Sequence, residues 1–196
     1  MSLFFPNEYV DSTYSINFEE FYKAGYRGVI FDIDNTLVPH GAPADERAIH
    51  FFARLRELGF VTTMVSNNKE PRVKSFCDAV ESPYIYKAGK PKPEGYEKAM
   101  DNMGTDKTNT LFVGDQIFTD VMGANLAGIY SILVKPIHPK EEIQIVLKRI
   151  PEKLVLFFYL KKHKLKTRQK EAVKKYDNRR GRVENENCYW KRSCSC

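Results

Sequence analysis

Asp32 and Asp34, two aspartates separated by one residue, are the side chains of this sequence best suited to chemistry. They interrupt the end of an apolar stretch, Gly28–Asp34 (GVIFDID), that reads as a buried strand. Their carboxylates lean the same way, close enough to share one cation, and a divalent cation removes the penalty of two adjacent negative charges. Oxygen-only ligands suit a hard cation such as Mg²⁺. One carboxylate of such a pair can attack phosphorus while the other carries a proton to the leaving group.

An aspartate pair of this spacing, taken alone, is just as typical of a turn or a helix N-cap. Other polar residues favour the chemical interpretation because they also stand where apolar stretches end. Ser66 and Asn67 close a second stretch, and Asp115 follows a third one, Thr110–Gly114. In a mostly parallel sheet the carboxyl ends of the strands meet at one edge, where ligands bind. We therefore expect these polar residues to converge with the aspartate pair.

The elements that would position these residues alternate between strands and helices. Strands are expected over 28–34, 60–66, 84–88, 110–114 and 130–134, and helices over 45–58, 71–79, 93–100 and 120–127. This alternation predicts an α/β fold with a mostly parallel sheet and helices on both of its faces. Residues 1–138 are expected to form this domain, including an N-terminal segment without an assigned role. Residues 139–196 are expected to form a helical, basic and partly disordered extension.

Four motifs, in this order, resemble those of the haloacid dehalogenase (HAD) superfamily of hydrolases. The first is FDIDNTL at Phe31–Leu37, and the second is VTTMVSN, which places a hydroxyl at Ser66. The third is AGKP, with its lysine at Lys90, and the fourth is GDQIFTD at Gly114–Asp120. The resemblance implies a Rossmann-like fold and phosphatase activity with Mg²⁺ as cofactor. A lone serine at a strand end is usually a cap and a lone lysine is usually a solvated charge, so the motifs carry weight only together.

The resemblance also implies a role for each acidic residue. Asp32 would attack the phosphoryl group and form an aspartyl-phosphate. Asp34 would protonate the leaving oxygen and then activate the water that hydrolyses this intermediate. Mg²⁺ would be held by the Asp32 carboxylate, the Asp34 backbone carbonyl and Asp115, with Asp120 supporting through water or from farther out.

The same resemblance assigns the transferring phosphoryl oxygens to three further groups. These are the hydroxyl of Ser66, the backbone N–H of Asn67 and the side chain of Lys90, placed where negative charge spreads in the transition state. Lys92 is the alternative lysine, but Lys90 lies nearer the end of the expected strand 84–88.

The sequence leaves no room for a cap domain over the site. The loop between the first motif and the helix at Asp45 is short, and only 24 residues lead from Ser66 to Lys90. An open site suggests a lipid or macromolecular phosphate as substrate, or a site that a partner or another subunit closes. A closer resemblance over residues 5–135, carried by PNEYV, VSNNK, KPKP and VGDQIFTDVMGAN, is to the YqeG-type branch of capless, class III HAD phosphatases. That branch is related to phosphatidylglycerophosphate phosphatases.

The last part of the chain differs sharply in charge from the rest. Residues 161–196 carry a net charge of +9, whereas the preceding residues carry −3. The apolar run Leu154–Leu160 (LVLFFYL) directly precedes KKHKLK. It is interpreted either as a helix packed on the domain or as an anchor to the anionic surface of a membrane. The basic segment could also contact RNA, although it lacks interleaved aromatic residues for base stacking.

Two classes of function therefore follow from the sequence. The first is a phosphomonoesterase, and phosphatidylglycerophosphate is the substrate that the resemblance suggests. The alternative is a binding module that keeps the HAD fold and docks on RNA, the ribosome or a membrane through its basic tail. The clustered carboxylates favour the enzyme. The sequence shows no secretory signal, and three of its four cysteines crowd the last nine positions, so a cytoplasmic protein with peripheral membrane contact is expected.

Overall fold

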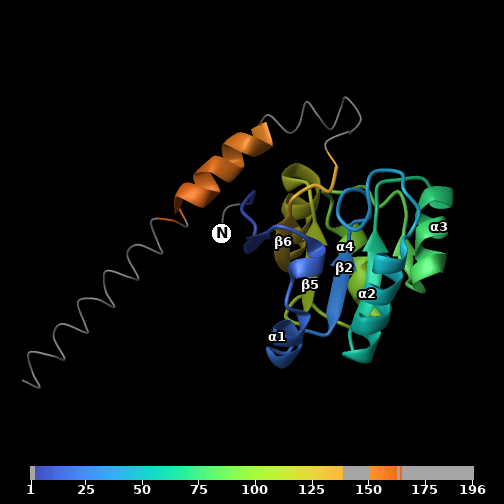
Figure 1. Cartoon of the computed structure of the whole chain (residues 1–196). Helices are drawn as coiled ribbons and strands as arrows, with labels where there is room; N and C mark the ends of the chain where they lie inside the picture. Colours follow the sequence, from blue (N-terminus) through green and yellow to red (C-terminus); the bar gives the residue numbers. More distant parts are fainter. Residues whose placement is uncertain (1–2, 139–150, 163, 165–196) are drawn as a thin grey trace, which may run out of the picture. The chain divides into compact units, whose positions relative to one another are not determined.

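The computed structural model describes residues 3–138, 151–162 and 164. Its contacts divide the chain into two units, residues 1–152 and residues 153–196. The first unit is built around one parallel sheet with helices packed against it (Figure 1). The strands are β1 (Glu8–Val10), β2 (Gly28–Phe31), β3 (Val61–Val65), β4 (Tyr84–Ile85), β5 (Thr110–Gly114) and β6 (Tyr130–Val134). The helices are α1 (Phe18–Lys23), α2 (Glu46–Glu57), α3 (Glu70–Val80), α4 (Glu94–Met103) and α5 (Met122–Ala127), with short turns at Thr13–Ser15 and Ile117–Val121.

The strand order of the sheet is β1-β6-β5-β2-β3-β4, and every pair is parallel. From β2 the chain first builds outward through β3 and β4 and then returns to the other side of β2 to form β5. The order therefore reverses between β2 and β5, and ligands of such folds bind at the carboxyl ends of the strands beside this switch point. The predicted Rossmann-like α/β fold is confirmed. No cap domain interrupts residues 35–45 or 67–89, where α3 and β4 are the only elements.

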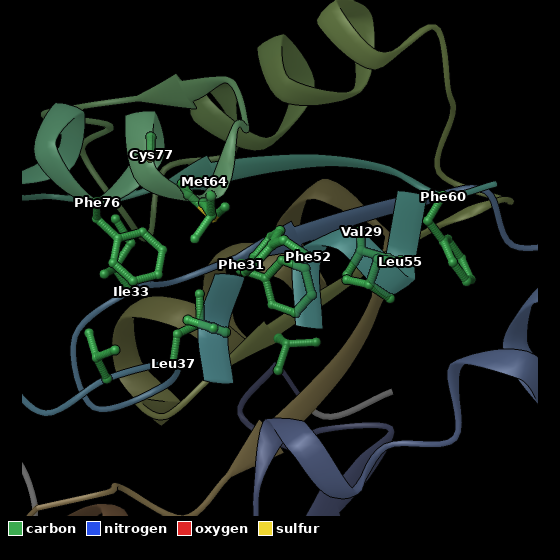
Figure 2. Close-up of a cluster of buried hydrophobic side chains, with 14 of the residues drawn as sticks. Val29, Phe31, Ile33, Leu37, Phe52, Leu55, Phe60, Met64, Phe76 and Cys77 are labelled. Atoms are coloured by element: carbon green, nitrogen blue, oxygen red, sulfur yellow. The ribbon is translucent and has the colours of Figure 1, made fainter. Parts of the chain in front are cut away.

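Alternating side chains of β2 enter two separate hydrophobic cores. Val29 and Phe31 face one core, in which Phe52 of α2 and Phe76 of α3 are fully buried (Figure 2). Ile30 faces the other core, which α4 and α5 cover. With both faces buried, β2 reads as a continuous apolar run, and the first charged residues after it fall at its carboxyl end.

The N-terminal segment forms elements that the sequence analysis did not anticipate. The three-residue strand β1 pairs with β6 at the sheet edge, and Phe18 of α1 is buried in the same core as Phe31. The segment escaped prediction because β1 is short and only half-buried, so it shows no clear alternation of apolar and polar residues. A second difference concerns the helix expected over 120–127. It begins with a π-helical turn at Ile117–Val121, which overlaps the end of the fourth motif.

A further helix covers residues 151–162. Leu154, Phe157, Phe158 and Leu160 are all between 46% and 60% exposed on it. Within the described residues, no helix has both the length and the apolar character needed to cross a bilayer. Most of the predicted basic extension, residues 139–150 and 165–196, lies outside the described residues, and its structure stays a prediction.

Candidate active site

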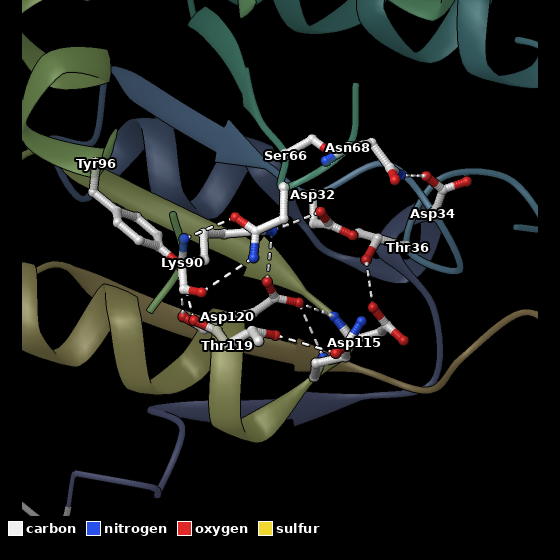
Figure 3. A network of polar contacts seen from close by, with 12 residues as sticks. Asp32, Asp34, Thr36, Ser66, Asn68, Lys90, Tyr96, Asp115, Thr119 and Asp120 are labelled. Carbon is white, nitrogen blue, oxygen red and sulfur yellow. Dashed lines mark hydrogen bonds and ion pairs between the residues drawn. The ribbon is translucent and has the colours of Figure 1, made fainter. Parts of the chain in front are cut away.

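Asp32 directly follows β2, and its backbone N–H donates to the carbonyl of Val113 on β5 (2.9 Å). This hydrogen bond holds the aspartate at the point where the strand order reverses. The residue lines a cavity of about 170 Å³ at the carboxyl edge of the sheet (Figure 3). The other lining residues come from the loops after the strands and from the π-helical turn that follows β5: Asp34, Asn35, His40, Ser66, Asn67, Asn68, Lys90, Gln116 and Thr119. Ser66 and Asn67 therefore lie at the same cavity as the aspartate pair, as predicted.

Lys90 joins two of the predicted acidic residues. Its Nζ lies 2.6 Å from Oδ1 of Asp32 and 2.7 Å from Oδ1 of Asp120, and all three side chains are buried. Burial lowers the pKa of Lys90, but the adjacent Asp120 and Asp32 carboxylates raise it more, so the ammonium stays charged. Lys92, the alternative considered from the sequence, is exposed on the surface rather than buried with the carboxylates. The lysine that reaches the carboxylates is thus Lys90.

The three acidic side chains Asp32, Asp115 and Asp120 form a buried group whose oxygens lie within 4.8 Å of one another. Burial raises the pKa of Asp32 to about 7, and the Asp120 charge adds to this effect, although Lys90 opposes it. One ammonium does not balance three carboxylates. A divalent cation fits this group because it would supply the missing positive charge and prefers oxygen ligands.

The carboxylate of Asp120 is largely committed to holding the fourth motif together. Its Oδ2 accepts the backbone N–H groups of Asp115 (3.1 Å) and Gln116 (3.0 Å), while Oδ1 accepts Lys90. Asp115 in turn accepts the hydroxyl of Thr36 at 3.3 Å. By contrast, Oδ2 of Asp32 makes no hydrogen bond or ion pair within the described part of the chain. Asp32 therefore keeps an oxygen that the described residues leave unengaged.

Asp34 turns away from this acidic group. Its side chain accepts hydrogen bonds from Asn68, Arg72 and the backbone of Gly41, and Figure 3 shows it on the side of Asp32 opposite Lys90. The Asp34 side chain is thus outside the group of carboxylates that could hold a cation together.

The two remaining predicted residues follow β3. The hydroxyl of Ser66 is buried, lines the cavity and accepts the backbone N–H of Asn68 (3.2 Å). The side chain of Asn67 binds both backbone groups of Lys90: its Oδ1 accepts the N–H (2.8 Å) and its Nδ2 donates to the carbonyl (3.1 Å). Asn67 therefore places the loop that carries the lysine, a contribution that the sequence analysis did not foresee.

Sequence reasoning also missed Thr36, Asn68, Arg72 and Tyr96. The hydroxyl of Tyr96 lies 3.2 Å from the carbonyl of Thr119 and 3.3 Å from that of Asp120, so it supports the fourth motif from α4. Arg72 offered a signal that could have been used, because it is a cation in the first turn of a helix, where the helix dipole disfavours positive charge. Such a residue needs a compensating anion, and Asp34 is that anion.

Gly114 has no side chain, and the Asp120 side chain occupies the space beside it. A Cβ atom at this position would lie 2.5 Å from Oδ2 of Asp120 and 2.7 Å from its Cγ, so Gly114→Ala must displace the carboxylate. We expect the free energy of unfolding to fall by about 1–3 kcal/mol and Mg²⁺-dependent phosphatase activity to fall at least roughly tenfold. Gly104→Ala is the matched control, because it adds a Cβ atom in open space at a left-handed residue. It should lower the melting temperature but leave activity unchanged; equal activity losses in both variants would contradict the close-approach explanation.

Comparison with known proteins agrees with the geometry. A model of the haloacid dehalogenase-like hydrolase family matches residues 40–128. The "Probable phosphatase YqeG" of Bacillus subtilis is 41% identical over 135 residues, which are 68% of this chain and 78% of that protein. The chloroplastic and mitochondrial phosphatidylglycerophosphate phosphatase 1 of Arabidopsis thaliana is 26% identical, over 72% of this chain and 43% of that protein.

Among solved structures, a cobalt-bound deoxy-D-mannose-octulosonate 8-phosphate phosphatase of Haemophilus influenzae has a TM-score of 0.47 at 13% identity, covering 57% of this chain and 80% of its own. The identity to YqeG extends over most of that protein, and the four motifs lie within residues 31–120 of this chain. The chain therefore belongs to the haloacid dehalogenase-like hydrolases and is a phosphatase of that family, similar to YqeG.

Proposed function

We propose that the chain is a Mg²⁺-dependent phosphomonoesterase that works through an aspartyl-phosphate on Asp32. The proposal rests on the surroundings of the Asp32 carboxylate. It is buried, lines the cavity, keeps one oxygen without a hydrogen bond among the described residues, and lies beside the ammonium of Lys90. A carboxylate in that position can attack phosphorus, while the lysine neutralises the oxygens on which negative charge gathers.

The acidic residues supply the ligands that a magnesium ion needs. Asp32, Asp115 and the backbone carbonyl of Asp34 would hold it, and Asp120 would support it through water or from farther out. When bound, Mg²⁺ neutralises charge on the transferring phosphoryl group. Asp120 suits this outer role because its own oxygens already bind Lys90 and two backbone N–H groups.

Asp34 would transfer the protons of both half-reactions. It would protonate the leaving oxygen as Asp32 becomes phosphorylated, and then take a proton from the water that attacks the aspartyl-phosphate. The Ser66 hydroxyl and the Asn67 backbone N–H would orient the phosphoryl oxygens, since Ser66 lines the same cavity as Asp32.

The expected substrate is a phosphate monoester carried on a larger molecule. Because no cap domain covers the cavity within the described residues, the rest of a phosphate ester could extend out of it. The partial similarity to a phosphatidylglycerophosphate phosphatase makes that lipid the first candidate. The purified protein with Mg²⁺ should be tested against phosphatidylglycerophosphate in detergent, sugar phosphates and nucleotides. Preference for a lipid phosphate supports the proposal, and inactivity on every phosphomonoester would refute it.

The helix over residues 151–162 is proposed to bring the enzyme to an anionic membrane surface. Phe157 and Phe158 are more than half exposed on it, and lysines follow at Lys161 and Lys162. Burying each phenylalanine in the lipid interface contributes about 1.5–3 kcal/mol, and each lysine near an anionic surface adds about 1 kcal/mol. We therefore expect Phe157→Ser combined with Phe158→Ser to weaken binding to phosphatidylglycerol vesicles at least roughly tenfold.

Co-sedimentation at low salt measures this effect, and added salt should weaken binding of the wild type. Leu126→Ser, on an exposed residue of α5, is the matched control and should bind normally. Both variants should hydrolyse a small aryl phosphate like the wild type, because none of the three substituted residues is among those that line the cavity. Wild-type protein that ignores anionic vesicles would exclude the membrane role.

A further inference from the structure

The carboxylate of Asp34 is held by three donors from three different segments. Its Oδ1 accepts Nη2 of Arg72 (2.9 Å) and the backbone N–H of Gly41 (2.7 Å). Its Oδ2 accepts Nδ2 of Asn68 (2.6 Å). Both oxygens are therefore engaged, and rotation of the carboxylate in either direction breaks at least one hydrogen bond.

Arg72 is the charged donor among these three, and its position in the fold is unfavourable in free energy for a cation. It lies in the first turn of α3, where the helix dipole disfavours a cation, and its Nε is buried without a hydrogen-bond partner among the described residues. Its guanidinium also lies 5.9 Å from the ring centre of Phe76, four residues further along α3, and the side chain is only 20% exposed. These features distinguish Arg72 from an ordinary surface arginine. The ion pair with Asp34 offsets the unfavourable free energy of placing the guanidinium there.

Arg72 itself is not among the residues that line the cavity, whereas its partner Asp34 is. Its contact with the cavity is therefore made through Asp34. We propose that Arg72 is a positioning residue that fixes the Asp34 carboxyl group, which in its protonated form gives its proton to the leaving oxygen and becomes the carboxylate that pairs with Arg72. This inference rests on the proposed function, because it assumes that Asp34 is the group that transfers the proton.

The dependence of kcat/KM on the leaving group separates this role from a general structural one. In a reaction through a covalent intermediate, kcat/KM reports the steps up to departure of the leaving group. Phenolate needs a proton as it leaves, whereas 2,4-dinitrophenolate does not. General acid catalysis contributes about 10²–10⁴-fold, so Arg72→Ala should lower kcat/KM for phenyl phosphate roughly 10- to 100-fold. For 2,4-dinitrophenyl phosphate the loss should stay within about threefold.

A double-mutant cycle with Asp34→Asn tests whether Arg72 acts through Asp34. In the Asp34→Asn background, adding Arg72→Ala should cause no further loss on phenyl phosphate, since the group that it positions is already disabled. Arg72→Lys keeps the positive charge on a shorter side chain. It should recover part of the kcat/KM for phenyl phosphate that Arg72→Ala loses. If Arg72→Ala does not fold, the two kcat/KM values of Arg72→Lys are compared with those of the wild type instead.

Arg56→Ala is the matched structural control. Arg56, on α2, donates to the carbonyl of Val80 at the end of α3 (2.8 Å) and pairs with Glu81. Both contacts lie at the end of α3 that is far from Asp34. Removal of Arg56 should leave the ratio of the two kcat/KM values unchanged even if the melting temperature falls. If instead Arg72→Ala lowers both kcat/KM values equally, or its loss adds fully to that of Asp34→Asn, the positioning role is wrong while the proposed function stands. Wild-type protein inactive on both esters would overturn the proposed function itself, and this inference with it.

Discussion

Replacing Asp32 with asparagine is expected to lower Mg²⁺-dependent hydrolysis of phosphomonoesters by roughly a thousandfold or more, the scale seen when a covalent nucleophile is removed. An amide has no negative oxygen to attack phosphorus, so no aspartyl-phosphate can form. The fold should be intact, because the backbone N–H of Asp32 and the Lys90–Asp120 pair do not depend on the lost charge.

The melting temperature without Mg²⁺ gives this experiment its internal check. Burial raises the pKa of Asp32 to about 7, which indicates that its charge is unfavourable in the folded protein without a cation. A neutral amide relieves this crowding, so Asp32→Asn should melt at the same temperature as the wild type or higher. Asp101→Asn, at an exposed residue of α4, is the control and should keep full activity. Near-normal turnover by purified Asp32→Asn would show that Asp32 is not the nucleophile.

The central part of this site could be predicted because it depends on local patterns. A strand buried on both faces is an apolar run, so the first polar residue after it marks the carboxyl end of a strand. Asp32, Ser66 and Asp115 were found in this way, and parallel pairing of β3, β2 and β5 brings their loops together. Nothing about these positions required knowledge of contacts between residues far apart in the sequence.

The surroundings of Asp34 could not be predicted, because they depend on how separate segments meet. Arg72 is 38 residues from Asp34, and the contact requires the first turn of α3 to face the loop after β2. Rotation about the Asp34 side chain is equally invisible in the sequence, so the spacing of the pair suggested that its carboxylates share a cation. The structure instead directs the Asp34 carboxylate toward Arg72, Asn68 and Gly41.

Removal of divalent cations is expected to silence the enzyme at least roughly a hundredfold, because the proposed phosphoryl transfer needs charge neutralisation that Lys90 alone does not provide. EDTA should abolish hydrolysis of an aryl phosphate, and excess Mg²⁺ should restore it. Zn²⁺ should substitute poorly, because the proposed ligands, the carboxylates of Asp32 and Asp115 and the backbone carbonyl of Asp34, are all oxygens and Zn²⁺ favours nitrogen and sulfur.

Thermal stability tests the same site without relying on activity. A cation that binds only the folded protein stabilises it by mass action, so the melting temperature of the wild type should rise with Mg²⁺ concentration. Asp115→Asn removes one carboxylate of the buried group and should flatten this rise, whereas Asp101→Asn should not. Because the carboxylates crowd one another without a cation, Asp115→Asn should also melt no lower than the wild type in EDTA. Full activity in EDTA, or an equal Mg²⁺-induced rise in wild type and Asp115→Asn, would show that the acidic group is not the metal site.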